Sequence, residues 1–550
     1  MHSPAAMLRL WHTVRHLKFV QVYGRARFRL ARPRPDMSPA PDVRAQEGSW
    51  VAPAARRASM VGPSALRLLH EVHDVNTCGW DDPAIAKLWR YNLHYFDDLL
   101  SEGAASRSDW HKAFMVRWVR ENVPAIGTGW EPYPTSLRII NWVKWGLAGN
   151  ELSAECLQSL AVQARWLRGR LEWHLLGNHL FVNAKALVFA GCYFDGPEAD
   201  AWLTKGLAIL RTQIPEQILA DGGQFERSPM YHALALEDML DLANLAHMFP
   251  ARSSGWRGMV EPLIYQMRRW LGVMCHPDGE ISFVNDSAIG IAPSPAQLDA
   301  YAQRLGCGIM PPPSDGCTLL PESGFVRMQK GPAVVIADVG SVGPAYLPGH
   351  AHAETLSFEL SLYGSRVLVN SGISEYGTSD ERLRQRSTAA HNTVVVLDEN
   401  SSEVWGGFRV ARRAHAFGYR ASEHVDQLIV TCSHDGYRRL KRGLNHTRTW
   451  VLRSSGLLLN DQLGTTAPMV GHLHFAPGAT NIIVDDGSCN LKISDIPIQI
   501  QVVGSSLATY ESRWFPSFGV SKPNCSVSLR GHGREMSTNI IWSNECTYSS

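Results

Sequence analysis

The sequence contains no CxxC pair and no dense cysteine cluster, although ten cysteines are scattered from Cys78 to Cys546. This scatter argues against a zinc ribbon and against a small disulfide scaffold, because both need closely spaced cysteines. Uncharged apolar runs are short, and none reaches the roughly 18 residues that a membrane-spanning helix needs. A P-loop, HExxH, GxSxG and a dinucleotide fingerprint are missing as well. Phosphoryl transfer, zincin proteolysis, α/β-hydrolase chemistry and hydride transfer therefore lack their usual sequence support.

The net charge is also small, because 53 Lys and Arg residues against 51 Asp and Glu residues leave a formal charge of only +2. This balance argues against a nucleic-acid partner, and a polyanion would have to be bound by a local pocket. Hydrophobic residues at 45% and charged residues at 19% are typical of a folded globular chain. At 550 residues the chain exceeds one hydrophobic core, so we expect two large domains or three smaller ones.

The N-terminal segment mixes apolar and basic residues. Basic residues interrupt every apolar run before a secretory signal could form, so we expect a cytoplasmic or membrane-peripheral protein, with a periplasmic location as the alternative. The pattern is compatible with an amphipathic helix on an anionic membrane surface, although a helix docked on the body of the protein is simpler. A Pro-, Ala- and Arg-rich tract from about Arg32 to Pro63 predicts an extended connector. Residues 1–63 thus form a basic extension and connector.

From residue 64 to residue 315, apolar residues recur at the spacing of amphipathic helices. Leu236, Met239 and Leu240 share one helical face, for example, and Ser294 begins a capping box three residues before Gln297. This stretch is long enough for about ten helices, the size of an α/α toroid, which is an incomplete helical barrel.

After residue 315 the hydrophobic period changes from 3.6 to 2. Leu356, Phe358 and Leu360 alternate with polar residues such as Ser357 and Glu359, which predicts a strand with one buried and one polar face. Short β-rich runs continue to the C-terminus without intervening helices, so residues 316–550 predict an antiparallel β-sandwich. The predicted fold class is α+β multidomain, with the helical toroid first and the sandwich second.

Two groups of polar residues interrupt the helical half. Asn178 and His179 lie in the apolar stretch LLGNHLFVNAKAL, where they form either a site or a satisfied network in the core. The segment DGGQFERSPMYH, from Asp221 to His232, gathers carboxylates, Arg, Tyr and His just before a helix. Carboxylates at a helix start also simply complement the helix dipole, but the Tyr and His are harder to explain in that way.

Two further groups precede strands in the second half. In extended backbone, His350 and His352 of GHAHAE would point the same way, which favours metal or acid–base chemistry over two solvated loop histidines. Arg384 and Arg386 of RQRSTAAHN either bind a carboxylate or sulfate or are solvated loop charges. If the four groups converge, the site lies at the interface of the two domains, a common place for a ligand cleft.

These residues resemble the heparinase II/III-like polysaccharide lyases, which pair an α/α toroid with a C-terminal antiparallel β-sandwich. The resemblance covers the chain from about Trp80 to Trp405, and its most specific piece is GHAHAETLSFELSLYGSRVLVNSGISEYG followed by RQRSTAAHNTVVV. GNHLFVNAKAL and DGGQFERSPMYH are similar to motifs of the family's helical domain. Membership implies a carbon–oxygen lyase that cleaves a uronate-containing polysaccharide, such as a glycosaminoglycan, alginate or exopolysaccharide, by β-elimination.

The resemblance also implies a role for each residue. Asn178, together with His179, would neutralise the uronate carboxylate. Tyr231 would act as the acid, or as both acid and base, and His350 as the base or its partner. Apart from the roles that the resemblance implies, we expect Arg138, Glu226 and Arg386 to contact the anionic substrate.

In some relatives of that family, two histidines and a carboxylate hold a zinc ion in the sandwich. The matching histidines here are His352 and His391, but Asn370 stands where the acidic ligand would be. A neutral amide is a poorer zinc ligand than a carboxylate. The resemblance therefore implies that catalysis requires no cofactor and that a zinc ion, where bound, is structural.

Two other functions stay open from the sequence. Asp221 and Glu226 could form the carboxylate pair of a toroid-type glycoside hydrolase. A non-catalytic glycan-binding protein of a polysaccharide-synthesis pathway would keep the same fold without cleaving its ligand.

Overall fold

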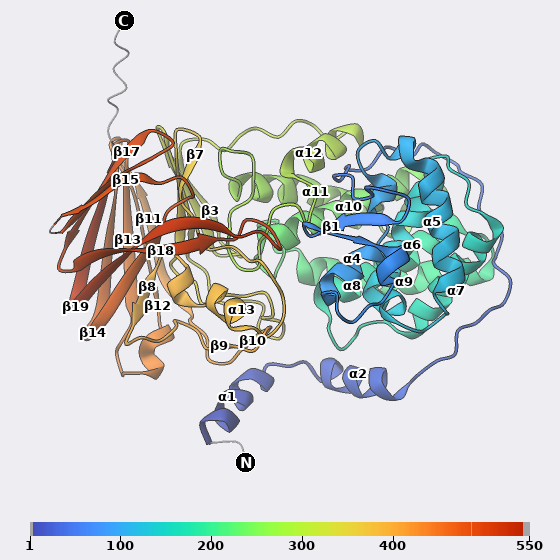
Figure 1. The fold of residues 1–550 in the computed structure, drawn as a ribbon, viewed down its shortest axis with the longest axis horizontal. Coiled ribbons are helices and arrows are strands. Elements are labelled where there is room, and N and C mark those ends of the chain that lie inside the picture. The colour runs from blue at the N-terminus through green and yellow to red at the C-terminus, as the bar shows by residue number, and fades with distance from the viewer. Residues whose placement is uncertain (1–3, 486, 543–550) are drawn as a thin grey trace, which may run out of the picture.

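The structure is a computed structural model that describes residues 4–485 and 487–542. Figure 1 shows a helical domain and a β-sandwich side by side, with two N-terminal helices along one edge of both. This arrangement confirms the predicted fold class, helical first and β second. The predicted domain boundaries stay predictions, and residues 543–550 of the predicted sandwich domain lie outside the described residues.

The helical domain consists of antiparallel helices that pack in pairs, such as α8 on α9 and α10 on α11. Proline occupies the first turn of α6, α9, α10 and α12, where its missing N–H costs no hydrogen bond. The elements are β1 Ala65–Leu68, β2 Glu71–Asp74, α3 Val75–Cys78, α4 Lys87–Leu93, η1 Asp97–Leu100, η2 Ala104–Arg107, α5 Ser108–Glu121, η3 Thr128–Trp130, α6 Pro132–Leu147, α7 Ala154–Gly169, α8 Gly177–Tyr193, α9 Pro197–Gln217, α10 Pro229–Met248, η4 Pro250–Gly255, α11 Arg257–Val273 and α12 Pro295–Arg304.

A local sequence signal predicted for one of these helices is confirmed. Ser294 accepts a hydrogen bond from the backbone N–H of Gln297, whose side chain accepts one from the N–H of Ser294, so the predicted capping box is present. The core of the domain is rich in tryptophan, and Trp118, Trp142 and Trp202 are almost completely buried in it. Burial of such large side chains supplies much of the hydrophobic stabilisation of the helical domain.

The sandwich of the second domain consists of two antiparallel sheets whose facing side chains share one core, and β9 and β10 form a separate two-stranded sheet beside it. Five strands run in the order β3-β4-β5-β6-β7 and the larger sheet follows β11-β12-β13-β14-β19-β17-β16-β15, with β18 on β19 and β8 on β14. The elements are β3 Gly316–Leu320, β4 Phe325–Lys330, β5 Ala333–Asp338, β6 Phe358–Leu362, β7 Ser365–Leu368, α13 Asp380–Gln385, η5 Thr388–Ala390, β8 Val394–Val396, β9 Val404–Trp405, β10 Arg409–Val410, β11 Ala416–Glu423, β12 Leu428–His434, η6 Gly436–Arg439, β13 His446–Arg453, β14 Gly456–His474, β15 Thr480–Asp485, β16 Ser488–Ile493, β17 Ile496–Val503, β18 Ser506–Trp514 and β19 Lys522–Trp542.

The strand β6 has the predicted alternation of apolar and polar side chains, and its polar face is buried as well as its apolar one. Glu359 and Ser361 both contact the ring of His276, which belongs to the helical domain. All five residues of the strand are buried. The five-stranded sheet therefore packs between the larger sheet and the helical domain, and its polar side chains pair across the domain interface rather than with water.

The N-terminal helices α1 (Pro4–Val14) and α2 (Phe19–Leu30) form an arm that touches both domains (Figure 1). Trp405 of β9 donates a hydrogen bond to Thr13, and the Phe28 ring lies 4.3 Å from the ring of His174 in the helical domain. The connector that follows has no helix or named strand between residues 31 and 64. Across residues 4–485 and 487–542, no helix is both long enough and apolar enough to cross a membrane.

Candidate active site

The predicted residues of the two halves meet where the loop between β5 and β6 contacts the starts of α8 and α10. Ser228 caps α10 by accepting a hydrogen bond from the N–H of Tyr231, and its hydroxyl donates to the backbone carbonyl of Asp286 at 2.6 Å. The N–H of Asp286 in turn donates to the carbonyl of His350 at 2.9 Å. These contacts tie the helix that presents Tyr231 to the loop that presents His350.

The Asp286 carboxylate lies at the centre of this cluster and is completely buried. It accepts hydrogen bonds from His350 Nδ1 and from His352 Nε2, each at 2.8 Å. Arg382 binds both carboxylate oxygens, at 2.5 and 2.6 Å. Burial alone would raise the pKa of Asp286, but the guanidinium and the two histidine hydrogen bonds hold it well below its ordinary value. Asp286 is therefore a fixed negative charge that orients both histidines.

His350 has one ring nitrogen available for proton transfer. Because the charged Asp286 can only accept, Nδ1 of His350 bears the ring proton, which leaves the lone pair on Nε2. Nε2 lies 3.5 Å from Oε2 of Glu226, a buried oxygen with no hydrogen-bond partner in the described structure. A proton taken up at Nε2 would thus be stabilised by the carboxylates on both sides of the ring.

Tyr231 lies against this imidazole, with ring centroids 4.1 Å apart. Its hydroxyl shares a hydrogen bond of 2.8 Å with the hydroxyl of Tyr376. Burial, the neighbouring Tyr376 and the charge of Asp286 raise the pKa of Tyr231 well above its ordinary value. The phenol is consequently held in its protonated form, which suits a proton donor.

The start of α8 reaches the same place. Gly177 has a φ of +55°, and a Cβ there would lie 2.4 Å from the side chain of Leu347 and 3.2 Å from Glu226, so glycine is required. Asn178, the next residue, is partly exposed. The helix N-terminus adds a favourable local potential for an anion at this point.

His179 follows on the first turn of α8 and is also partly exposed. Its Nδ1 lies 3.1 Å from Glu172 and its ring packs on Tyr133. Burial opposes the charged imidazolium, but the carboxylate of Glu172 outweighs it and raises the pKa of His179 above its ordinary value. His179 therefore favours the cationic form beside Asn178.

His352, Glu354 and His391 bring potential metal-ligand atoms within 4.8 Å of one another. The Nδ1–H of His391 donates to the carbonyl of Ser387, so its Nε2 has a free lone pair. His352 donates from Nε2 to Asp286, so its Nδ1 also has a free lone pair, 3.1 Å from that Nε2. Burial lowers the pKa of His352 to about 4, which keeps the ring neutral.

The third member of this group supplies a carboxylate oxygen without a partner. Oε2 of Glu354 lies 3.3 Å from Nε2 of His391 and accepts no hydrogen bond. Burial and the nearby charge of Asp338 raise the pKa of Glu354 well above its ordinary value, and a cation beside it would stabilise the ionised form. Two imidazoles and a carboxylate are a ligand set that fits zinc. Asn370, the residue expected at the acidic position, instead accepts a hydrogen bond from the N–H of Asn392.

The three predicted substrate contacts, Arg138, Glu226 and Arg386, are all completely buried, which contradicts a direct contact with substrate. Arg138 is completely buried in the helical domain, where it donates to Gln163 and lies 3.7 Å above the ring of Trp118. Arg386 is completely buried too, and it donates to the carbonyls of Ala351 and of the Gly406–Gly407 turn. Both guanidiniums are used to hold the fold, so neither faces a substrate.

Three residues of the cluster were missed by the sequence reasoning. Asp286 lies outside the motifs that stood out and approaches the site only through folding. Tyr376 does lie in a quoted motif, near the end of GHAHAETLSFELSLYGSRVLVNSGISEYG, but nothing in that pattern points to a contact with Tyr231. Glu354 does have a sequence signal, because it belongs to the HAHAE run and follows His352 at a spacing of two. That spacing would have supplied the carboxylate that position 370 lacks.

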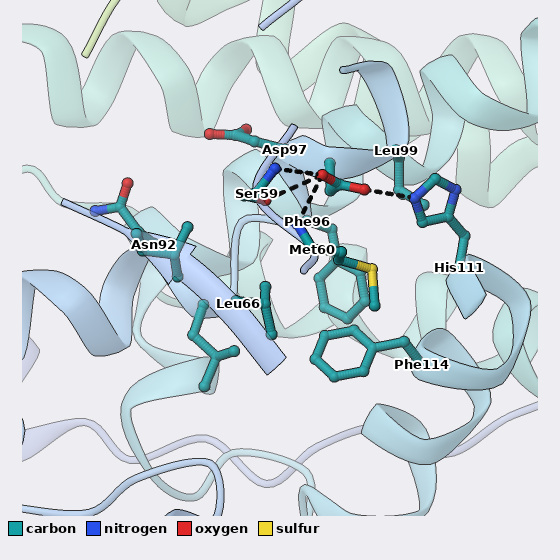
Figure 2. A pocket seen from close by; sticks show the side chains of 12 residues that line it. Ser59, Met60, Leu66, Asn92, Phe96, Asp97, Leu99, His111 and Phe114 are labelled. Atoms are coloured by element: carbon teal, nitrogen blue, oxygen red, sulfur yellow. Dashed lines mark hydrogen bonds and ion pairs between the residues drawn. The ribbon is translucent and has the colours of Figure 1, made fainter. Parts of the chain in front are cut away.

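A small pocket in the helical domain, shown in Figure 2, is a structural hydrogen-bond centre. Asp98 accepts hydrogen bonds there from the backbone N–H groups of Ser59 and Met60, from Arg107 and from His111. The pocket encloses about 20 Å³, enough for about one water molecule. These contacts fix the connector on the helices and leave no room for a substrate.

Comparison with known proteins adds two family matches and several relatives. Residues 146–294 match the family model "Heparinase II/III N-terminus" and residues 312–543 match "Heparinase II/III-like, C-terminal". A heparin-sulfate lyase of Bacteroides stercoris is 24% identical over 252 residues, which is 41% of this chain but only 36% of the lyase. The chain thus matches about a third of the length of that relative.

Two other similarities extend over more of the chain. The FtsZ-localized protein C of Caulobacter vibrioides is 27% identical over 463 residues, covering 78% of this chain and 73% of that protein. A crystal structure of heparinase III superposes with a TM-score of 0.70 at 18% identity, covering 87% of this chain and 82% of the other. The structural match concerns the fold as a whole, both domains included.

Proposed function

Since this chain belongs to the heparinase II/III-like family, we propose that it is a polysaccharide lyase that cleaves a uronate-containing polysaccharide by β-elimination. The observation that supports this most is the pairing of Tyr231 with an Asp286-oriented His350 at the junction of the two matched domains. One group is poised to accept a proton and the other is held in a proton-donating form, as the two halves of an elimination require.

His350 is the base in this proposal. Its Nε2 removes the weakly acidic proton next to the uronate carboxylate, and the electron pair of that C–H bond forms the new double bond. The bond to the leaving glycosidic oxygen breaks at the same time or from an enolate-like intermediate. Asp286 on one side of the ring and Glu226 on the other stabilise the imidazolium that results.

Tyr231 is the acid. Its hydroxyl gives a proton to the leaving oxygen, and the proton on His350 is afterwards available to restore the phenol, so that no cofactor is consumed. The hydrogen bond between the hydroxyls of Tyr231 and Tyr376 fixes the position of the phenol that donates this proton. This assignment narrows the sequence-based alternatives, in which Tyr231 served as acid alone or as acid and base.

Asn178 and His179 neutralise the uronate carboxylate in this mechanism. The enolate-like intermediate carries its extra negative charge on that carboxylate. Hydrogen bonds to the carboxylate therefore strengthen as the intermediate forms, and this lowers the barrier. An amide N–H of Asn178 and the imidazolium of His179 at the start of α8 are suited to this role.

We propose that the lyase reaction needs no cofactor and that a bound zinc ion would be structural. His352, His391 and Glu354 would hold the ion, which would supply a rigid link between the loop of His350 and the strand that follows His391. His352 in turn contacts Asp286, so the ion would stiffen the orientation of the base indirectly.

The test is incubation with a panel of uronate polymers, monitored by the ultraviolet absorbance of the conjugated product and by new reducing ends. Absorbance and reducing ends together are expected from a lyase. Reducing ends without absorbance would contradict the lyase and favour a hydrolase. Binding without cleavage of any polymer, unaffected by Tyr231→Phe, would favour a binding protein.

The hydrolase is the weaker alternative, because Asp221 is not free to act. Its carboxylate accepts hydrogen bonds from the N–H groups of Gly223, Glu322 and Ser323 and from the Ser323 hydroxyl. The carboxylate pair that an inverting glycosidase needs would therefore lack one member.

A non-catalytic role is the second candidate, favoured by the long match to the Caulobacter protein, whose name describes a location rather than a reaction. The proposed macromolecular partner is in either case an anionic polysaccharide and not a nucleic acid. Of the locations considered from the sequence, we propose the membrane-peripheral one, which the exposed apolar residues of the N-terminal arm support.

A further inference from the structure

The helix α1 presents its apolar stripe away from the protein. Met7, Leu10, Trp11 and Val14 follow one another at the spacing of a single helical face, and between 40% and 64% of each side chain is exposed. The opposite face meets the sandwich through Thr13, which accepts a hydrogen bond from Trp405. A helix that served only to pack on the body would have these faces reversed.

The helix α2 has the same orientation. Its inward face consists of Gln21 and Gly24, which are buried, and Phe28, which packs on His174. Gly24 fits because a Cβ would lie 3.0 Å from the backbone of His174. On the outward face, the exposed large apolar side chains are Phe19, Val22, Tyr23 and Leu30, of which Phe19 is 82% and Leu30 84% exposed.

Basic residues flank these two stripes, and acidic ones are missing. Arg15 follows the first helix, and Arg25, Arg27 and Arg29 belong to the second helix. Arg9 and Lys18 face the body instead, where Arg9 lies over the ring of Trp405 and Lys18 pairs with Glu216. The first acidic residue of the sequence is Asp36. A chain with a formal charge of only +2 thus concentrates positive charge beside its exposed apolar side chains.

We propose that the outward face of this arm binds the surface of an anionic phospholipid bilayer. Two amphipathic helices with aromatic and aliphatic side chains outward and arginines at their flanks match the interfacial zone of a bilayer, where rings enter the acyl boundary and guanidiniums meet phosphates. The positive charge of the arm favours an anionic lipid surface over an uncharged apolar protein surface as the partner. The inference rests on the membrane-peripheral part of the proposed function and is independent of the lyase reaction.

The arm would hold both domains at the bilayer. Trp405 connects α1 to the sandwich, whereas Arg170 donates a hydrogen bond to the carbonyl of Phe28 and connects α2 to the helical domain. Gln21 donates to the carbonyl of Tyr346, four residues before His350. The bilayer-binding face is therefore anchored close to the loop that bears the proposed base.

The test is co-sedimentation of the full-length protein with vesicles of phosphatidylcholine alone or mixed with phosphatidylglycerol. Binding to the mixed vesicles at low salt is expected, with loss at high salt as charges are screened. Phe19→Glu and Trp11→Glu should each weaken binding by at least about tenfold, since a large apolar side chain no longer enters the bilayer. Charge reversal at Arg27 or Arg29 should weaken it about fivefold per unit of charge lost.

Matched controls come from the sandwich domain. Val425 is 92% exposed and Arg420 is exposed, so Val425→Glu again replaces an exposed apolar side chain by a carboxylate and Arg420→Glu makes the same charge reversal, both outside the arm. Both variants should leave binding unchanged. Absence of binding to the mixed vesicles, or equal losses in the controls, would overturn the inference, as would capture by a protein partner without vesicle binding. Vesicle binding by a protein that cleaves no uronate polymer would contradict the lyase proposal alone.

Discussion

Oδ2 of Asp286 lies 2.8 Å from Nδ1 of His350, while Nε2 of the same ring lies 3.5 Å from Oε2 of Glu226. The imidazole is thus held between a carboxylate that fixes its proton and one that can stabilise its charge. Arg382 and His352 occupy the remaining positions around Asp286. The orientation of the proposed base therefore depends on a residue that makes no contact with substrate in the mechanism.

Asp286→Asn should reduce elimination strongly. An amide in place of the carboxylate allows the wrong tautomer of His350, and loss of an orienting carboxylate beside a catalytic histidine costs up to about 10⁴-fold in kcat. The substitution also leaves Arg382 buried without its partner, which should lower the free energy of unfolding by about 3–5 kcal/mol. Both effects are measured on enzyme shown to be folded by circular dichroism.

The control for this variant is Asp461→Asn. Asp461 has similar buried partners in the sandwich, with His446 Nε2 at 2.6 Å and Arg448 Nε at 2.8 Å. This variant should lose stability to a similar extent without changing kcat of the folded enzyme. Equal losses of kcat in both variants would mean that Asp286 acts only through stability.

Tyr231→Phe should lower kcat by about 10²–10⁴-fold, the range expected when a general acid is removed. Tyr376→Phe removes only one hydrogen bond, worth about 1 kcal/mol, and should cost about tenfold or less. Stopped-flow or steady-state absorbance of the unsaturated product measures both. Near-wild-type elimination by Tyr231→Phe would disprove its role as acid.

Substrate affinity should fall as the pH rises through the raised pKa of His179. Glu172 raises the pKa of His179, so the imidazolium is present below that raised pKa and is lost as the pH increases through it. KM for a uronate oligosaccharide should then increase by roughly tenfold, the loss expected for a charge-assisted hydrogen bond. Glu172→Gln should move this rise in KM to lower pH, and His179→Gln should remove it. A KM profile unchanged in both variants would exclude His179 from carboxylate binding.

Purified protein should contain one zinc ion per chain, measured by elemental analysis, if the three lone pairs of His352, His391 and Glu354 share a cation. His352→Ala and Glu354→Gln should lose the ion. Chelation of the ion should lower Tm, because the loop of His350 would no longer be linked through the metal to His391. Asn370→Ala should retain it. Zinc retained by Glu354→Gln but lost by Asn370→Ala would restore position 370 as the ligand, and protein without zinc would contradict the site.

The local hydrophobic pattern of the sequence was sufficient to predict a helical domain followed by a β domain. The change of hydrophobic period near residue 315 separates helices from strands, and short-range signals such as the capping box at Ser294 occur as expected. The same pattern predicted the strand β6 but not the burial of its polar face. A hydrophobic period of two shows only that one face of a strand is apolar and the other polar. Whether water or protein covers the polar face of β6 depends on the position of His276, which belongs to the helical domain.

For the candidate site, too, the sequence predicted one part and the tertiary structure decided the rest. The sequence by itself determined which groups exist: the motifs around Asn178, Tyr231 and His350 contain the residues that we propose as donors, acid and base. Only the tertiary structure decided which groups are free to act. It brings Asp286 to His350 and buries Arg138 and Arg386 in internal hydrogen bonds. The physical reason is competition, because a buried arginine or carboxylate must find partners inside the protein, and those partners come from segments far apart in the chain.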